Sequence, residues 1–317
     1  MLFTVPLSAY SGVVRIGFYV QSTVLSTAST DFFLDNVEIR ATPACPDIAG
    51  NMPTVVSATA TTAEIAWTSA GSPTQFEVEY GAVGHTPGTG IIISAAASPV
   101  TLTGLTGNTS YEVYVRQICG AAGNGAWSYP ASMRTNITPN WTEDFTLAFP
   151  PQGWTRAAGL IKDTTVFSTT TTSSWGADGF ANNGTTGAAR VNVFSTTADE
   201  WLMTPTIELP SNGSAYELTF DMSIMEFASS TLEGIIGVDD TVMVVISTDN
   251  GATWSRSNVL YMIHQGNKPA GFSWPVSISL MGYSGNIKIG FYGESTVSNE
   301  DIDVFIDNVA IMENCAL

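Results

Sequence analysis

The chain has 317 residues, of which 28 are acidic and 10 are basic, so its formal net charge is −18. A surface of this sign repels phosphate backbones and excludes the binding of nucleic acid through a basic face. Apolar residues make up 44% of the chain and include 8 Trp, which is enough for packed cores and excludes intrinsic disorder. No apolar run approaches the roughly 18 residues of a membrane-spanning helix, so we expect no membrane insertion.

An internal repeat organises the sequence. The segment GVVRIGFYVQSTV that starts at Gly12 recurs as GNIKIGFYGESTV at Gly285, and the copies are followed by DFFLDNVEI and DVFIDNVAI. Asp35 and Asp307 mark the same position in these two copies. Similarity at a long, fixed spacing indicates a tandem array of repeated units. We therefore expect residues 1–42 to be the C-terminal strands of an incomplete jelly-roll domain, and the chain to be part of a longer array.

Residues 43–138 show the pattern of short β-strands. Apolar and polar residues alternate in 63–67, 75–80 and 109–118, and clusters of glycine, proline and asparagine separate these runs. Alternation with a period of two is typical of a strand with one buried face. About seven such strands in about 90 residues favour an immunoglobulin-like Greek-key sandwich.

Landmarks in this segment are similar to those of a fibronectin type III domain. Trp67 lies where the core tryptophan of such a domain would be, and Tyr111, after LTGLTGNTS, lies where its tyrosine corner would be. In bacterial surface versions of the domain an entry cysteine commonly pairs with one at the end of the sixth strand. The resemblance thus implies a Cys45–Cys119 disulfide, with Cys315 belonging to a following module. The cysteine spacing alone leaves three buried thiols as the alternative and does not fit a zinc site.

Residues 139–317 also consist of strand-like segments, and none shows a convincing helical period of 3.6. Long strands joined by loops rich in glycine, serine and threonine favour a jelly roll. The predicted fold class is therefore all-β, with jelly-roll sandwiches alternating with the immunoglobulin-like one. The clearest strand-like segments are residues 201–209, 216–222, 241–247 and 286–292.

A series of landmarks in this second segment resembles the MAM-like jelly rolls called cleaved-adhesin or choice-of-anchor J domains. These domains occur beside fibronectin type III modules in secreted proteins of Bacteroidetes, including the haemagglutinin regions of gingipains. The resemblance implies an adhesin-type repeat that is exported by the type IX route. The landmarks are EDF at 143–145, PPQGW at 150–154, DEWLMTP at 199–205, STDNGATW at 247–254 and FIDNVAI at 305–311.

The strongest candidate for bound chemistry is a structural calcium ion. Glu143 and Asp144 open the jelly roll, and Asp303 and Asp307 lie near its closing strand. First and last strands of a sandwich are often neighbours, and calcium takes hard oxygen ligands such as carboxylates. The family resemblance implies calcium at these ends, and Asp31 and Asp35 repeat the positions of the closing-strand pair. The alternative is that the aspartates accept hydrogen bonds from nearby backbone amides and close the sandwich without metal.

Two further acidic groups precede predicted strands. They are open to two interpretations, a second bound ion or ordinary solvated loops, and the sequence favours the solvated loops. The groups are Glu294, Glu300, Asp301 and Asp303 before the closing strand, and Asp239 and Asp240 before another.

Trp175 is the best candidate for contact with a ligand. It lies in the polar stretch SSWGADGFANNG together with Asp178, and an exposed tryptophan ring offers a flat face on which a sugar can stack. The alternative is a role in the core, which we expect for most of the other tryptophans because they lie in strand-like or turn contexts.

No pattern in the sequence singles out catalysis. The motifs GxSxG and HExxH are absent, and with only 2 His a Ser-His-Asp arrangement would be fortuitous. A glycosidase pair of carboxylates depends on a separation that the sequence does not give. The motif SxDxGxTW at 247–254 is an Asp box, which we interpret as a structural hairpin. We therefore expect a protein that is not an enzyme.

The sequence predicts a modular protein of the extracellular space or outer cell surface. Its expected role is adhesion to an extracellular protein or glycan, with neighbouring repeats of the same chain as further partners. Two other roles stay open at this point. One is a carbohydrate-binding or accessory region of a larger secreted hydrolase or protease, and the other is a structural subunit of an extracellular filament.

Overall fold

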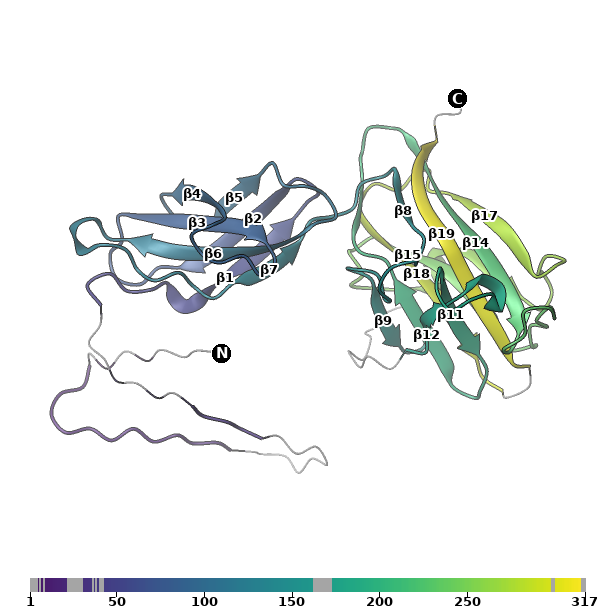
Figure 1. Cartoon of the computed structure of the whole chain (residues 1–317), viewed down its shortest axis with the longest axis horizontal. Helices are drawn as coiled ribbons and strands as arrows, with labels where there is room; N and C mark the ends of the chain where they lie inside the picture. Colours follow the sequence, from purple (N-terminus) through teal and green to yellow (C-terminus); the bar gives the residue numbers. More distant parts are fainter. Residues whose placement is uncertain are drawn as a thin grey trace. The chain divides into compact units, whose positions relative to one another are not determined.

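The computed structural model describes residues 5, 7, 9–21, 31–35, 37, 39, 43–161, 173–297 and 300–314. In these residues the regular structure is β-strand apart from three short 3-10 helices, which confirms the all-β prediction. The chain divides into two compact units, each described here by itself (Figure 1). The described residues before Cys45 form no strand, and the origin of residues 1–42 in a jelly roll stays a prediction. Cys315 lies outside the described residues.

The first sandwich has two sheets, with the strand orders β1-β2-β5 and β4-β3-β6-β7. Side chains alternate between buried and partly exposed along β2, as the period-two pattern predicts. The strands are β1 (Ala49–Ala58), β2 (Thr62–Thr68), β3 (Gln75–Ala82), β4 (Ile91–Ala95), β5 (Val100–Thr103), β6 (Ser110–Ile118) and β7 (Ala131–Arg134), and a 3-10 helix, η1 (Gly120–Ala122), follows β6.

The core of the first sandwich is centred on Trp67. Its ring meets that of Phe76 edge to face, with 5.0 Å between the ring centroids. Both rings are buried, as are Ile65 and Val78 on the same strands. The tryptophan therefore has the core position that the sequence predicts.

A disulfide joins Cys45 to Cys119 in the first unit, with a Cα–Cα distance of 5.5 Å. The predicted pairing is confirmed. The bond spans a sequence separation of 74 residues. Closing a loop of this length removes enough entropy from the unfolded chain to stabilise the fold by about 4 kcal/mol.

The second sandwich has two six-stranded sheets. One has the order β10-β11-β19-β14-β17 with β8 also paired to β19, and the other has the order β16-β15-β18-β12-β9 with β13 also paired to β18. The strands are β8 (Trp141–Glu143), β9 (Thr155–Ala158), β10 (Gly176–Asp178), β11 (Ala188–Val193), β12 (Ala198–Met203), β13 (Ile207–Leu209), β14 (Ala215–Glu226), β15 (Thr241–Ser247), β16 (Val259–His264), β17 (Ser273–Ser279), β18 (Gly285–Ser295) and β19 (Ile302–Asn314), with η2 (Phe180–Asn182) and η3 (Arg256–Asn258) between strands.

Strands β18 and β19 hold the centres of the two sheets. Strand β18 lies between β15 and β12, and β19 lies between β11 and β14. Both strands are apolar on two faces: Phe291 and Ile306 enter the main core, whereas Tyr292 and Phe305 belong to smaller clusters. Strands buried on both faces lose the polar half of the alternation, which explains their nearly continuous apolar runs.

The register places the connections of the second sandwich at two opposite ends. Glu226 of β14 and Val193 of β11 both lie opposite Ile302, so the loops that follow β11 and β14 share an end with the start of β19. Ala198 lies opposite Ser295, which adds the loops before β12 and after β18 to the same end. Strand β8 pairs instead with the far part of β19, where the chain enters and leaves the sandwich (Figure 1).

Candidate functional site

Four carboxylates lie on or next to β8, β14 and β19, where β8 and β14 both pair with β19. Glu143 lies opposite Val309, and Asp221 lies opposite Asp307 just after a bulge in β14. Asp144 follows Glu143 and is close enough for its charge to act on Asp307. We call Glu143, Asp144, Asp221 and Asp307 the carboxylate cluster.

The carboxylate cluster is linked by backbone and amide donors. The Asn308 side chain donates from Nδ2 to Asp221 Oδ2 at 2.9 Å, and the Asn308 backbone N–H donates to Asp307 Oδ1 at 2.6 Å. Glu143 Oε1 accepts from the backbone N–H of Phe145 at 3.0 Å. These bonds are of the kind that the amide-bonded alternative predicts, and they do not test whether an ion binds here.

Burial and mutual repulsion act on the two central acids. Burial raises the pKa of Asp307, and the negative charges of Asp221 and Asp144 raise it further, against the lowering effect of the Asn308 amide. Burial likewise raises the pKa of Glu143, with a smaller contribution from Asp144. In contrast, the hydroxyl and amide of Thr146 lower the pKa of Asp144. A cation at this position would relieve the repulsion.

The chemistry of this donor set suits a hard divalent ion, because every side-chain donor is an oxygen. Across the described ranges, however, no three His, Cys, Asp or Glu side chains are grouped so that they could hold a metal ion. An ion at the cluster would therefore require at least one carboxylate to turn away from its amide donor.

Asp303, the fourth predicted metal ligand, lies away from the cluster. It is four residues from Asp307 on the same extended strand, which corresponds to about 13 Å. Its carboxylate is fully buried, and its Oδ1 lies 2.9 Å from Arg190 Nε and 2.5 Å from Arg190 Nη2. Oδ2 accepts from the backbone N–H of Ala228 at 2.8 Å and from Asn182 Nδ2 at 3.3 Å. These contacts make Asp303 the anchor of a buried ion pair rather than a companion of Asp307.

The structure corrects the prediction for Trp175. Its side chain is only 1% exposed, and its Nε1–H donates to the backbone oxygen of Glu200 at 3.2 Å. The ring packs in the main core of the second sandwich, so it offers no face to a sugar. The local sequence around Trp175 is polar and gives no sign of burial, because the residues that cover the ring belong to strands that are distant in the sequence. Asp178 is partly exposed and lies 3.7 Å from Arg190 Nε, beside the Asp303 ion pair.

The Asp box forms the predicted structural hairpin. Asp249 Oδ1 accepts from the Ser247 hydroxyl at 2.6 Å and from the Thr253 amide at 2.9 Å. These donors lower the pKa of Asp249 to about 2. Gly251 has a φ of 83°, which a side chain would strain, and Trp254 is completely buried beneath the turn.

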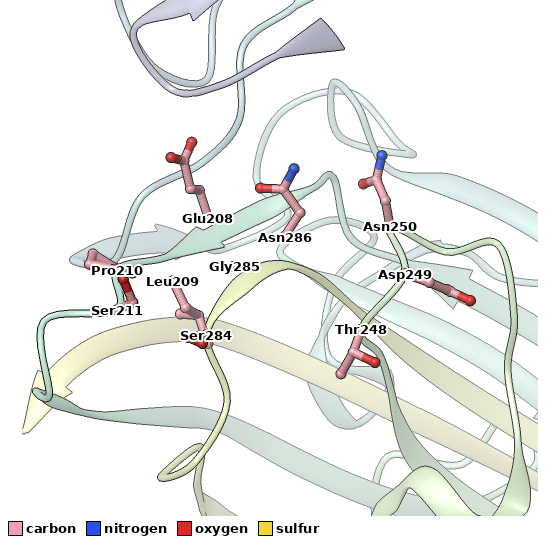
Figure 2. Close-up of a pocket in the computed structure, with 10 residues that line it drawn as sticks. All are labelled: Glu208, Leu209, Pro210, Ser211, Thr248, Asp249, Asn250, Ser284, Gly285 and Asn286. Carbon is pink, nitrogen blue, oxygen red and sulfur yellow. The ribbon is translucent and has the colours of Figure 1, made fainter.

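One side of this hairpin borders an open pocket of ≈ 680 Å³. Glu208 of β13, Asn250 of the hairpin and Asn286 of β18 extend to the same side (Figure 2). None of the residues lining the pocket is aromatic, so it lacks the flat apolar face that usually holds a sugar ring. The lining residues are Glu208, Leu209, Pro210, Ser211, Thr248, Asp249, Asn250, Ser284, Gly285 and Asn286.

The two other acidic groups are held by the protein itself. Asp239 Oδ2 accepts from the amides of Thr296 and Val297 at 2.8 and 2.7 Å, which ties the loop after β14 to the loop after β18. Burial raises the pKa of Asp240, and the charges of Asp239 and Glu300 add to this effect.

Apolar side chains gather in the loops at the end of the second sandwich opposite to β8. Their exposed fractions range from 38% for Phe194 to 78% for Val238. Phe227 donates its backbone N–H to the backbone carbonyl oxygen of Asp301 at 3.0 Å, which joins two of these loops. The sequence analysis missed this feature, because only the strand register shows which loops share an end. We define the loop-end surface as Phe194, Phe227, Leu232, Ile235, Val238 and Val297.

Comparison with known families identifies the first sandwich. The model of the family described as "Fibronectin type III domain" matches residues 51–134. The first sandwich is a fibronectin type III domain. None of the curated proteins matches the chain.

Solved structures that are similar to the chain come from three kinds of protein. The K1 cleaved adhesin domain of Lys-gingipain from Porphyromonas gingivalis W83 is 19% identical, covering 55% of this chain and 98% of that domain with a TM-score of 0.37. A carbohydrate-binding module of the β-sandwich superfamily is 10% identical over 82% of this chain and 96% of its own, with a TM-score of 0.33. A fibronectin type III domain of human collagen α-1(XX) is 20% identical over 29% of this chain and 85% of its own, with a TM-score of 0.24.

The fibronectin type III domain carries one buried acid that the sequence analysis did not single out. Glu79 is fully buried and accepts from the amides of Gly88 and Gly90, at 2.7 and 2.6 Å, in the loop between β3 and β4. His85 Nε2 lies 3.5 Å from the same carboxylate. The Glu79 side chain thus holds the loop in place from the inside. This role could not be recognised from the sequence, because it depends on how the loop folds over β3.

Proposed function

We propose that this chain is a non-catalytic binding segment of a secreted adhesin, in which the loop-end surface makes the contact with the partner. The observation that carries the proposal is the exposure of six large apolar side chains at one end of a sandwich. Apolar groups that are gathered in this way commonly mark an interaction site. The fibronectin type III domain acts as the spacer between such binding units.

We further propose that the chain is located outside the cell. The Cys45–Cys119 bond supports it, because disulfides form and persist in oxidising compartments. The described residues contain no helix with the length and apolar character needed to cross a membrane. The sequence landmarks support an origin among the cleaved-adhesin or choice-of-anchor J repeats of Bacteroidetes, with export by the type IX route and neighbouring repeats as partners.

The partner we propose is a protein surface that is apolar at its centre and basic at its edge. Acidic residues occur in the same loops as the loop-end surface, with Glu226 at the end of β14, Glu233 after it and Glu300 before β19, and the whole chain carries a charge of −18. Complementary charge around an apolar contact speeds association and suppresses wrong partners. A glycan is the second candidate, although the pocket beside the Asp box offers polar side chains without an aromatic ring for a sugar to stack on.

Calcium binding by the carboxylate cluster is a separate part of the proposal. Glu143, Asp144, Asp221 and Asp307 would hold the ion, and Asp303 is excluded because Arg190 already neutralises it. When bound, the ion supplies positive charge that offsets the repulsion among these acids. The nearby charges of Asp221 and Asp144 support this proposal, because after burial they are the causes that raise the pKa of Asp307.

The adhesive role is tested by binding the chain to arrays of extracellular-matrix proteins and of glycans. We expect saturable binding to at least one protein, with affinity reduced at least 10-fold by Ile235→Asp and by Val238→Asp. Met281→Asp is the matched control, because Met281 is 73% exposed in the loop between β17 and β18 at the opposite end. Binding to glycans alone would favour the carbohydrate-binding role, and the absence of binding on both arrays would reject adhesion.

A further inference from the structure

Strand β4 forms one edge of its sheet in the fibronectin type III domain (Figure 1). Among the strands that the structure describes, β4 pairs only with β3, so the N–H and C=O groups along its other side have no partner strand. Its apolar side chains are also open to solvent, since Ile91 is 59% exposed and Ile92 is 42% exposed. An exposed, apolar edge of this kind is a template for pairing with another strand.

The edge at β4 lacks the features that normally prevent such pairing. Proteins protect exposed edges with a charged residue, a proline or a bulge. Three other edge strands of this chain carry one of these residues, with Arg134 in β7, Arg156 in β9 and Pro275 in β17. Strand β4 contains neither a charged residue nor a proline, and its register with β3 runs without a bulge. The edge is therefore suited to being covered by another strand.

The charge around β4 favours a second copy of the same chain as the source of that strand. Residues 86–111, which include β4, contain no charged residue. Residues 43–138 contain 5 acidic and 2 basic residues, so this domain carries little of the net charge of −18. An uncharged edge does not select a basic or an acidic partner. A second copy presents an equally uncharged, apolar edge and places no like charges opposite each other.

The sequence of β4 is also complementary to itself. A two-fold axis at Ile93 would pair the 5 residues of β4 antiparallel with those of a second copy. Ile93 would then lie opposite its own equivalent, Ile92 opposite Ser94, and Ile91 opposite Ala95. Each side chain meets one from the same face of the sheet, because side chains alternate between the two faces along a strand. A patch that contacts its own copy in this way satisfies the condition for a closed two-fold dimer.

We propose that the fibronectin type III domain pairs with that of a second copy of this chain, edge to edge through β4 in this register. The sheets of the two copies would then continue into each other across the two β4 strands. One strand of 5 residues is a small contact beside the roughly 800 Å² per partner of a standard interface, so the dimer should be weak and depend on concentration. The loop-end surface takes no part in this contact, so the pairing is tested separately from adhesion.

Sedimentation equilibrium of the full chain over a series of concentrations tests the pairing. We expect a monomer–dimer equilibrium whose dissociation constant rises about 10-fold or more in Ile92→Lys, because the substitution places two positive charges near each other across the contact. Val56→Lys is the matched control and should leave the constant unchanged, since Val56 is 55% exposed on β1, an edge strand of the other sheet. Higher salt should favour the dimer, because it screens the repulsion between two chains of charge −18.

A mixture of two variants tests the register. Because Ile92 would face Ser94 of the other copy, Ile92→Lys and Ser94→Asp should each associate weakly alone but form a mixed dimer together, which native mass spectrometry identifies by its mass. A mixture that stays monomeric would reject the pairing. A wild-type chain that is monomeric at every concentration would reject it as well and leave the edge to a different protein. So would a loss of association in Val56→Lys equal to that in Ile92→Lys.

Thermal unfolding of each variant separates a loss of pairing from a loss of the fold. Both Ile92 and Ser94 are exposed, so the variants should melt at the wild-type temperature. If Ile92→Lys melts lower, Ile91→Lys takes its place at the more exposed position, with the same expected rise in the dissociation constant. An unchanged dissociation constant in a correctly folded variant would overturn the proposal.

Discussion

At the scale of single residues, Asp303 and Asp307 of β19 show how differently the same type of side chain can be used. Asp303 is neutralised by Arg190 and bonded on both oxygens, whereas Asp307 is surrounded by other carboxylates. Both were equally plausible as metal ligands in the sequence, because the pattern DxxxD carries no information about which basic residue lies across the sheet. That information comes from the pairing of β11 with β19.

Replacing Asp307 by asparagine should stabilise the metal-free protein at neutral pH. The folded pKa of Asp307 is raised, so its contribution to stability is greatest below the unfolded pKa and is lost as pH rises through the folded value. A neutral asparagine removes that loss, so we expect the free energy of unfolding in EDTA to rise by roughly 0.5–1 kcal/mol. The same variant should lose any stabilisation that calcium gives the wild-type protein. Asp144→Asn should have the opposite sign in EDTA, because the pKa of Asp144 is lowered.

Thermal unfolding with EDTA and with calcium measures both effects. Equal melting temperatures of the wild-type protein under the two conditions would reject the calcium proposal. Such a result would not affect the proposed repulsion among the carboxylates, because that repulsion is tested by comparing the variants in EDTA alone.

Removing Arg190 should be the most damaging change to a single charge in the second sandwich. Arg190→Met leaves the Asp303 carboxylate buried without its cation, which typically costs about 3 kcal/mol or more. Arg256→Met is the control, since Arg256 pairs with Glu294 but its own side chain is 50% exposed, so a loss below about 1 kcal/mol is expected. Urea unfolding of both variants gives the comparison, and similar losses would contradict the distinction.

At the scale of elements, the sequence predicted what is encoded locally. The Asp box, the strands with period-two alternation and the core position of Trp67 all depend on residues close together in the chain. Trp175 and the loop-end surface were missed for the opposite reason. Their environment is set by the register of strands that are far apart in the sequence, and a polar local sequence conceals it.

The Asp box hairpin should lose stability when its central acid is neutralised. Asp249 has a folded pKa of about 2, so its contribution is present above the unfolded value and is lost as pH falls through about 2. Asp249→Asn keeps the shape but weakens two charge-assisted hydrogen bonds, and we expect a loss of about 1 kcal/mol at pH 7. Thr248→Ala, at an exposed neighbouring position, should change little in the same urea titration.

Gly17 and Gly290 occupy the same position in the two copies of the internal repeat, but they should respond differently to substitution by alanine. Gly290→Ala places a methyl group against Trp254 and Trp201, so a loss of about 2 kcal/mol is expected in the unfolding of the second sandwich. Gly17→Ala should leave the full chain unchanged, because no atom lies near the added methyl group. A large effect of Gly17→Ala on the full chain would contradict the open surroundings of this residue.

At the scale of the whole molecule, the repeat and the disulfide were both predicted before the fold was known. The resemblance to bacterial fibronectin type III domains identified the cysteine pair, and the structure confirms it. The two sandwiches were accessible because each has its own pattern of strands. The loop-end surface was not, since its residues come from loops that are far apart in the sequence.

Breaking the disulfide should affect only one of the two units. Cys45→Ser combined with Cys119→Ser should lower the stability of the fibronectin type III domain by about 2–4 kcal/mol. The transition of the second sandwich should keep its midpoint. Differential scanning calorimetry resolves the two transitions, and a shift of both would show that the units unfold together.

The position of β8 has a consequence for how the second sandwich responds to tension. The chain enters at β8 and leaves after β19, and these antiparallel strands are neighbours through three residue pairs. A pulling force on the two ends would therefore open this ladder one pair at a time, like a zipper, instead of shearing it all at once. Glu143 and Asp307 lie beside the last of those pairs. A change in the balance of their charges is therefore expected to change the force at which this ladder opens.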